Sequence, residues 1–293
     1  MESGHSVTLG RGASGDMAIS ADLFQQRPGL NLPRPPLADA HVSKRQLELR
    51  ATDDGIAYRN IGRCGLFANG ASATAGLAKL GDTLYLEGAS LWLVVNRPPV
   101  LVELTWVPLP GSAAFGKADR SGIIGESPAI WALRDQIGFV AGKQSHVLVV
   151  GDEGTGKRLV AEGIHGLSVR AGYPLITDPL DDFHDGSTLY VDLDDVGDDV
   201  FTHLRRVLVS GKDLRIIGST REPGALPADL VSSLELQVRA PGLEDRPEDI
   251  PLLISHLLGS GFADVDPGMV DALLRHSYTR HLGELEDLIG STT

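Results

Sequence analysis

The sequence predicts two folded domains of different class: an all-β sandwich, followed by an α/β domain with a parallel sheet and a small C-terminal helical lid. The length of 293 residues suggests two domains at roughly 150 residues each. Apolar residues alternate as in short strands up to about residue 105, and apolar runs alternate with helical spacing after about residue 121. Residues 1–105 hold 10 basic and 10 acidic residues, so the net charge of −13 belongs to the rest of the chain.

Composition excludes several classes of protein. The single cysteine, Cys64, excludes an internal disulfide and a cysteine-based zinc site. Apolar runs such as residues 91–95 are far shorter than the ~20 residues of a membrane span, and the first residues lack the features of a secretory signal. The acidic second half is a poor partner for a nucleic-acid backbone. We expect a cytoplasmic protein that binds neither membranes nor DNA directly.

The first half is predicted to contain short strands separated by turns. Residues 46–50 alternate strictly between apolar and polar, and residues 83–86 and 91–95 are further strands. The proline-rich stretch 27–37 is expected to be a loop. The turn signals between strands are Asp53-Asp54-Gly55, Asn69-Gly70, Gly81-Asp82 and Glu87-Gly88. This spacing indicates a β-sandwich over residues 1–105, followed by a linker at 106–120.

The second half alternates helices and strands, which indicates a parallel sheet over residues 121–240. The nearly continuous apolar run at 146–150 is typical of a strand buried on both faces. Helical spacing returns from Asp249 onward and predicts a helical lid over 241–293. The other expected elements are helices at 129–140 and 159–167 and strands at 189–191 and 214–217.

The segment Gly151-Asp152-Glu153-Gly154-Thr155-Gly156-Lys157 follows the strand at 146–150 and opens a helix. That context is the one a phosphate-binding loop requires. Glycines let backbone N–H groups converge on phosphates at a helix N-terminus, and Lys157 adds a point charge. Arg158 follows, where a serine or threonine usually helps to hold Mg²⁺. The alternative is a glycine-rich turn with an exposed lysine.

Further segments resemble the AAA+ domain of sigma-54-dependent transcription activators, over roughly residues 121–293. The segments that carry the resemblance are Gly122-Ile123-Ile124-Gly125-Glu126-Ser127-Pro128, Ile164-His165, residues 186–192 and residues 243–253. The resemblance implies ATP and Mg²⁺ as ligands, with Asp192 as the Walker B aspartate that binds the metal. The nucleotide-binding residues that it implies are Gly151, Gly154, Thr155, Gly156, Lys157, Arg158 and Asp192.

The groups that drive ATP hydrolysis in that family are replaced here. Leu193 stands in place of the glutamate after the Walker B aspartate, Arg221 in place of a sensor asparagine, and Gly283 in place of a second sensor arginine. Residues 226–234, which match the arginine-finger stretch, contain no arginine. Because phosphoryl transfer depends on positioned cations and an oriented water, we expect a pseudo-ATPase. Asp194 or Asp195 could substitute for the glutamate only if the strand slipped by one or two residues.

The contacts that such activators make with the transcription machinery are also missing. Only 35 positions separate Lys157 from Asp192, too few for the family's Gly-Ala-Phe-Thr-Gly-Ala loop that engages the sigma factor. Residues 178–199 instead hold nine aspartates and no lysine or arginine, which we interpret as a solvated acidic surface. No helix-turn-helix segment follows the lid, so we expect no DNA-binding domain.

The first half resembles a forkhead-associated (FHA) domain over roughly residues 5–98. Gly10-Arg11, Val42-Ser43-Lys44-Arg45 and the segment 62–70 carry the resemblance. It implies binding of phosphothreonine peptides, with Arg11 and Ser43 on the phosphate and Lys44 or Arg45 as a second cation. A guanidinium with a short hydroxyl suits a phosphate monoester.

Three positions of this half bear on the FHA resemblance. Gln46 replaces the histidine that usually braces the loops, and Cys64 replaces an asparagine that holds the peptide. Asn69 retains the later asparagine-glycine turn, and we include it among the peptide-binding candidates. A sandwich used only for protein docking is the alternative.

These features predict a bacterial signalling or transcription-regulation protein that binds a phosphothreonine-bearing partner and holds ATP weakly without hydrolysing it. Other partners considered are sigma-54 RNA polymerase, a related AAA+ activator and a second copy of the chain. The first alternative is an active ATPase, a sigma-54 activator that lacks its own DNA-binding domain. The second is a docking scaffold in which neither site binds a ligand.

Overall fold

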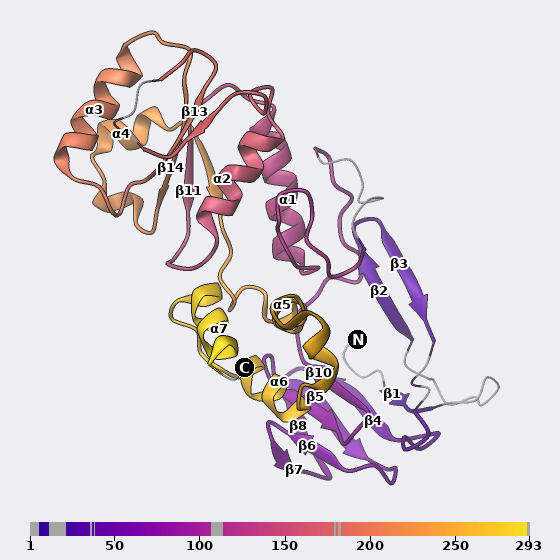
Figure 1. Cartoon of the computed structure of the whole chain (residues 1–293). Coiled ribbons are helices and arrows are strands. Elements are labelled where there is room, and N and C mark those ends of the chain that lie inside the picture. Colours follow the sequence, from indigo (N-terminus) through magenta and orange to yellow (C-terminus); the bar gives the residue numbers. More distant parts are fainter. Residues whose placement is uncertain are drawn as a thin grey trace. The chain divides into compact units, whose positions relative to one another are not determined.

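The computed structural model describes residues 6–11, 22–35, 37, 39–106, 114–178, 180 and 183–291 (Figure 1). The chain divides into two compact units. The first, which we call the β unit, comprises residues 1–102 and 259–277, and the second, the α/β unit, comprises 103–258 and 278–293. Residues 107–113, which include most of the prolines and glycines of the predicted linker, lie outside the described residues.

The β unit contains two four-stranded antiparallel sheets, with strand orders β1-β4-β5-β8 and β10-β9-β6-β7. Leu9 and Leu47 of the first sheet and Leu66, Leu84 and Leu86 of the second are buried in one shared core, so the two sheets form a sandwich. The strands are β1 Ser6–Leu9, β4 Leu47–Thr52, β5 Gly55–Asn60, β6 Leu66–Ala68, β7 Ala71–Ser72, β8 Ala75–Ala78, β9 Thr83–Leu86 and β10 Ser90–Leu93.

The expectation of a loop over residues 27–37 is wrong for most of that stretch. The chain forms a hairpin there, β2 Leu23–Arg27 and β3 Leu30–Arg34, closed by Gly29 at a φ of +69°. Pro33 lies opposite Phe24 within the ladder. A two-stranded ribbon leaves one edge of each strand unpaired, and proline is tolerated at such an edge because it needs no N–H partner.

Part of the predicted lid belongs to the β unit. The 3-10 helix η3 Gly259–Asp264 and helix α6 Pro267–Leu274 lie in it. Asp271 of α6 is buried, accepts a hydrogen bond from the Thr83 hydroxyl of β9, and pairs with Arg275 at 2.8 Å. A buried carboxylate is retained when it is paired and hydrogen-bonded in this way.

The α/β unit is built on a five-stranded parallel sheet of order β12-β13-β14-β11-β15. The strands are β11 Val147–Val150, β12 Leu175–Ile176, β13 Thr188–Asp192, β14 Arg215–Thr220 and β15 Leu236–Arg239. The helices are α1 Pro128–Ala141, α2 Lys157–Gly166, α3 Asp198–Val209, α4 Ala228–Ser233, α5 Ile250–Leu258 and α7 His281–Gly290, with short 3-10 turns η1 Pro223–Ala225 and η2 Pro247–Asp249.

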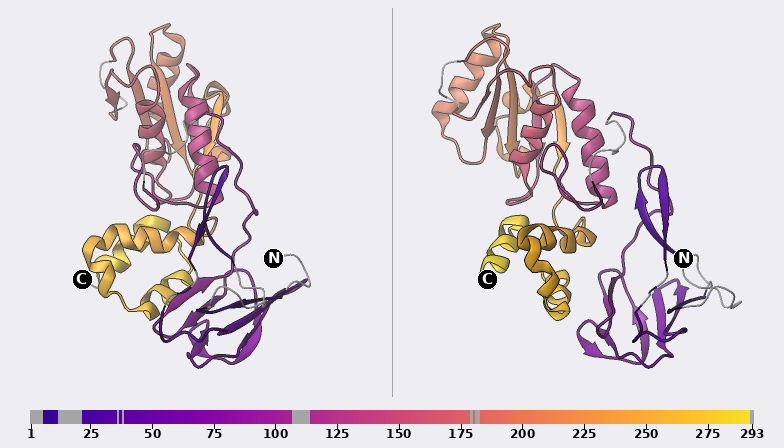
Figure 2. Two further views of the ribbon diagram at one scale, coloured as in Figure 1. Left: turned by 90° about the vertical axis from the view of Figure 1, so that its right-hand side faces the viewer. Right: turned by 45° about the vertical axis from the view of Figure 1, so that its right-hand side comes forward.

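Each face of this sheet is covered by helices (Figure 2). Val147 and Val149 of β11 pack in one core with residues of α1 and α2, whereas Leu148 packs in the other with residues of α3 and α4. This burial on both faces explains why the strand is a continuous apolar run. Within the described residues, no helix is both long and apolar enough to span a membrane.

Candidate functional site

The loop between β11 and α2 closes around Lys157. The Lys157 Nζ donates hydrogen bonds to the carbonyls of Gly151 and Asp152, at 2.9 and 3.1 Å, and the residue is only 9% exposed. Gly154 and Gly156 have φ values of +75° and +86°, a region that glycine enters without strain. Since Gly156 is the N-cap of α2, the free N–H groups of the first helical turn face this loop.

Two further predicted nucleotide-binding residues differ in where their side chains go. The Thr155 hydroxyl donates to the Asp152 carbonyl at 2.9 Å and so lies within the loop. The Arg158 guanidinium is exposed and pairs with Glu162, one turn along α2, at 3.0 Å. The structure therefore keeps Thr155 with the loop and directs Arg158 along the helix.

An apolar cavity of about 190 Å³ lies beside the loop. It joins Thr155 and Gly156 to the segment before α1 and to helices α5 and α7. Its polar lining comes from Arg246, His256 and Glu286, and the remaining lining residues are Gly122, Ile123, Ile124, Ile130, Leu133, Leu159, Val160, Pro241, Leu253, Leu257 and Leu282.

The first turn of α7 is attached to the loop. The Leu282 amide donates to the Gly154 carbonyl at 3.1 Å, and a Cβ on Gly154 would overlap the Arg280 carbonyl. His281 is buried at a φ of +44°, with Nδ1 3.0 Å from Glu244 and Nε2 3.8 Å from Asp152. Sequence reasoning missed this attachment because His281 and Asp152 share no spacing motif.

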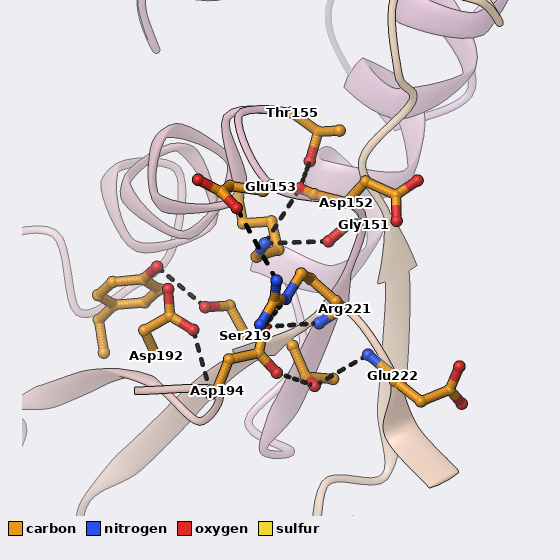
Figure 3. Close-up of polar contacts among 12 residues, drawn as sticks. Gly151, Asp152, Glu153, Thr155, Asp192, Asp194, Ser219, Arg221 and Glu222 are labelled. Carbon is orange, nitrogen blue, oxygen red and sulfur yellow. Dashed lines mark hydrogen bonds and ion pairs between the residues drawn. The ribbon is translucent and has the colours of Figure 1, made fainter. Parts of the chain in front are cut away.

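Asp192, the predicted Walker B residue, ends β13, and β13 pairs with β14 in unbroken register up to Asp192 and Ser219. Its Oδ1 accepts a hydrogen bond from the Asp194 amide at 3.3 Å (Figure 3). Leu193 is 3% exposed and belongs to the core under the sheet. No strand slip therefore brings another carboxylate into the position of Leu193.

Asp194 is held by the end of β14. Its oxygens accept from the Thr220 hydroxyl at 2.7 Å and from the Arg221 amide at 2.9 Å. Burial raises the pKa of Asp194, but the bonds from Thr220 and Arg221, together with the charges of Arg221 and Lys157, outweigh it and lower the pKa below its usual value.

Arg221 bridges the loop between β11 and α2, residues 151–156, and the segment after β13 (Figure 3). Its guanidinium lies 3.3 Å from the Asp194 carboxylate and 3.8 Å from the Glu153 carboxylate. These residues fit a magnesium site poorly. Mg²⁺ takes oxygen ligands in a near-octahedral arrangement, whereas Asp194 already accepts hydrogen bonds from Thr220 and Arg221. Arg158 supplies no hydroxyl, which leaves Asp192 as the oxygen donor of the expected set.

In the β unit, three loops meet at Ser43. Its carbonyl accepts from the Arg11 amide at 3.0 Å, its hydroxyl accepts from the Arg63 amide at 3.0 Å, and its own amide donates to Gln46. The side chains of Arg11, Lys44, Arg45 and Arg63 are exposed around it, and Arg45 lies 3.4 Å from Glu48. Sequence reasoning left Arg63 out of the site, although it lies in the 62–70 segment that was singled out.

Gln46 braces these loops. It is fully buried, and its Oε1 accepts from the amides of Ser43 and Cys64 while its Nε2 donates to Asn60 at 2.7 Å and to the Cys64 carbonyl at 3.0 Å. Glutamine thus fixes the loops at the position where the FHA resemblance places histidine. The Cys64 thiol donates to the Glu87 carbonyl, and burial raises its pKa.

Asn69 lies apart from the Ser43 loops, at the opposite end of β6 from Cys64. Its Oδ1 accepts from the Thr83 amide and its Nδ2 donates to Asp82, both at 2.9 Å. With a φ of +50°, it holds the β6–β7 turn. The structure therefore brings Arg11, Ser43, Lys44 and Arg45 together and leaves Asn69 out.

Comparisons with known proteins find a family-model match within the α/β unit. Residues 123–183 match the family model of the sigma-54 interaction domain. The regulator ZraR of Escherichia coli K12 is 28% identical over 59% of this chain and 52% of that protein. The C4-dicarboxylate transport regulator DctD of Pseudomonas aeruginosa is 27% identical over 56% and 48%.

A crystal structure of NtrX from Brucella abortus, in complex with ATP, matches with a TM-score of 0.51 and 26% identity over 57% of this chain and 49% of that one. The α/β unit has an AAA+ P-loop fold. This chain spans about half the length of the relatives it matches. The family-model match ends at residue 183, before the replaced positions Leu193, Arg221 and Gly283.

Proposed function

We propose that this chain is a bacterial signalling or transcription-regulation protein that binds ATP in its AAA+ unit without hydrolysing it and binds a phosphothreonine peptide through an FHA-like sandwich. The functional domains in this proposal are residues 1–105, the linker 106–120, the nucleotide-binding region 121–240 and the lid 241–293. ZraR and DctD are regulators by name, which supports a role in transcription control.

The cavity beside the Lys157 loop is the main support for the proposed binding of a nucleotide. Glycines at positive φ and the N-terminus of α2 present N–H donors to an anion. The adjacent cavity is lined mainly by aliphatic side chains, which suit a flat, weakly polar base. A nucleotide has both parts, a polyphosphate and a base, and NtrX, a structural relative, was crystallised with ATP.

The side chains after Asp192 support the absence of hydrolysis. Leu193 is buried in the core and Asp194 is held by Thr220 and Arg221, so neither orients a water for attack. Removing positioned catalytic groups of this kind lowers phosphoryl-transfer rates by orders of magnitude. ATP binding would then set the conformation of the unit, because binding stabilises whichever state holds the ligand.

The Ser43 loops support the phosphopeptide half. The Arg11 amide donates to the Ser43 carbonyl and the Arg63 amide to the Ser43 hydroxyl, so two residues with exposed guanidiniums are anchored at Ser43. Guanidiniums bind phosphate through paired, charge-assisted hydrogen bonds. Arg45 and Lys44 add charge at the same end of the sandwich, and the partner we propose is a phosphothreonine-bearing protein.

The similarity of the α/β unit to sigma-54 regulators supports a partner in transcription control. We include sigma-54 RNA polymerase, a related AAA+ activator and a second copy of this chain as candidates. Since only 35 positions separate Lys157 from Asp192, a related activator, which would supply its own sigma-contacting loop, is the partner we favour.

Two titrations test the proposal. Calorimetry with ATP should show binding by the wild type and by Lys212→Ala, a control at an exposed lysine, and none by Lys157→Ala. Phosphothreonine peptides should bind the wild type and Arg50→Ala, an exposed arginine of β4, and should not bind Arg11→Ala. ATP turnover abolished by Lys157→Ala would favour the active activator, and a lack of binding in both titrations would favour the scaffold.

A further inference from the structure

We propose that Arg221 takes the place of the divalent cation in the nucleotide site, so that the chain binds the metal-free nucleoside triphosphate. This inference rests on the proposed nucleotide binding and specifies the ionic form of the ligand. Four features of the α/β unit carry it: the position of Arg221 in the sheet, its carboxylate partners, the donors available to a metal, and the charge that a triphosphate brings.

Arg221 is positioned by the order of strands. β14 lies between β11, which leads into the phosphate loop, and β13, which ends at Asp192. Carboxyl ends of parallel strands meet at one edge of the sheet, where ligands bind. The Gly151 amide donates to the Thr220 carbonyl at 3.1 Å, so Arg221 leaves the sheet directly beside the first residue of the loop.

The carboxylates around Arg221 hold its guanidinium over that edge. The Asp194 carboxylate accepts hydrogen bonds from the Arg221 amide at 2.9 Å and from the Arg221 Nε at 3.3 Å. The Glu153 carboxylate, in the phosphate loop, lies 3.8 Å from the Arg221 Nη1. The Asp194 contacts fix the base of the side chain, and the longer Glu153 pair, between side chains 53% and 63% exposed, is weak. A phosphate oxygen entering the loop can therefore replace Glu153 without detaching Arg221 from Asp194.

The positions expected to hold Mg²⁺ no longer offer a suitable set of donors. Position 158 is an arginine paired with Glu162 and not a hydroxyl residue, so of the two positions expected to hold Mg²⁺ only Asp192, whose Oδ1 accepts the Asp194 amide, offers an oxygen ligand. Asp192 pairs in register with Ser219, two residues before Arg221, so the guanidinium adds positive charge at the edge of the sheet where a divalent cation would bind, and like charges repel. The guanidinium supplies positive charge and two parallel N–H donors, which neutralise phosphate without any metal.

The test compares ATP binding by the full chain in Mg²⁺ and in EDTA, measured by calorimetry. The affinities of the wild type for ATP in Mg²⁺ and in EDTA should agree within about twofold, which is a difference in binding free energy below 1 kcal/mol. Arg221→Ala should weaken binding in EDTA by about tenfold or more, as expected for a lost charge-assisted contact. The ATP affinity of Arg221→Lys in EDTA should lie between those of the wild type and Arg221→Ala, since lysine keeps the positive charge but lacks the planar pair of N–H donors.

A second variant and a control guard against misfolding. Glu153→Gln removes the competing carboxylate and should tighten ATP binding in EDTA by about two- to fivefold, as for an exposed ion pair. Arg205→Ala removes an exposed arginine of α3 that pairs with Asp229 of α4, outside the loop and the end of β14, and should leave the affinity for ATP unchanged.

The inference is overturned if Mg²⁺ tightens wild-type binding by more than about tenfold, or if Arg221→Ala binds ATP in EDTA as well as the wild type. Those results would leave the proposed nucleotide binding intact. If the wild type binds ATP neither in Mg²⁺ nor in EDTA, the proposed function fails and this inference fails with it.

Discussion

The Leu282 amide donates a hydrogen bond to the Gly154 carbonyl across 3.1 Å, so the first turn of α7 contacts the loop between β11 and α2. Gly154 has a φ of +75°, and a Cβ there would overlap the backbone of Arg280. Loop and helix are therefore a single assembly. A change of conformation in the loop would act directly on α7, because the contact is between backbones and cannot be relieved by a side-chain rotation.

Gly154→Ala tests this contact. We expect it to lower the free energy of unfolding of the α/β unit by about 1 to 3 kcal/mol, because the new methyl group adds both left-handed strain and overlap. Chemical denaturation measures the change. Gly283→Ala, in α7 itself, meets open space and should be neutral or stabilising by up to about 1 kcal/mol. Equal stability of Gly154→Ala and wild type would show that the loop and α7 are not in contact.

Gln46→Ala tests the brace of the Ser43 loops. The change leaves the amides of half-buried Ser43 and buried Cys64 without an acceptor, and an unsatisfied buried group costs about 1 to 3 kcal/mol. We expect lower thermal stability of the sandwich and loss of phosphopeptide binding. Gln237→Ala, at an exposed position of β15, is the control, and its free energy of unfolding should lie within about 0.5 kcal/mol of that of the wild type. Retained peptide affinity in Gln46→Ala would contradict the role of the brace.

Asp194 should contribute a pH-dependent part of the stability. Its pKa is lowered in the folded state, because its hydrogen bonds and neighbouring charges outweigh the effect of burial. The Asp194 carboxylate therefore stabilises the fold at pH values above its unfolded pKa of about 3.9. That contribution is lost as the pH falls through the lower folded pKa. Asp194→Asn should therefore cost about 1 to 3 kcal/mol at neutral pH and progressively less in acid.

Urea unfolding across the acid range checks the Asp194 prediction. The neighbouring Asp195→Asn is a matched control, because Asp195 is exposed, and it should shift stability by no more than about 0.5 kcal/mol. A cost of Asp194→Asn that stays constant down to the most acidic pH would mean that its carboxylate does not form the bonds to Thr220 and Arg221.

The thiol of Cys64 should react slowly in the folded protein. It is buried, and burial raises its pKa, so less of the reactive thiolate forms near neutral pH. Because Cys64 is the single cysteine, an absorbance assay with a thiol reagent reports on it alone. Modification should be slower in buffer than in urea by about tenfold or more. Equal rates would place the Cys64 thiol at the surface.

Local patterns in the sequence predicted much of the fold. The apolar run at 146–150 became β11, and the glycines around Lys157 predicted a loop that the structure closes at the start of α2. Pro33 misled the prediction, because a proline in a strand is tolerated only at an edge, and the edges of an unknown sheet cannot be assigned from one sequence.

The contacts that define the sites were harder to predict. Arg63 joins Ser43 across 20 positions of the chain, and Arg221 joins Asp194 across 27. Such contacts depend on which strands become neighbours. Residue type alone could indicate Arg221 as a departure from the resembled family, but only the order β13-β14-β11 places it between the loop and Asp194.

We expect the AAA+ unit to hold ATP without cleaving it. The most direct test incubates the chain with ATP labelled on its terminal phosphate, separates bound from free ligand, and identifies the bound species. We predict that the wild type retains label as intact ATP, and that Lys157→Ala retains none. Recovery of released labelled phosphate from the wild type, abolished in Lys157→Ala, would contradict the claim.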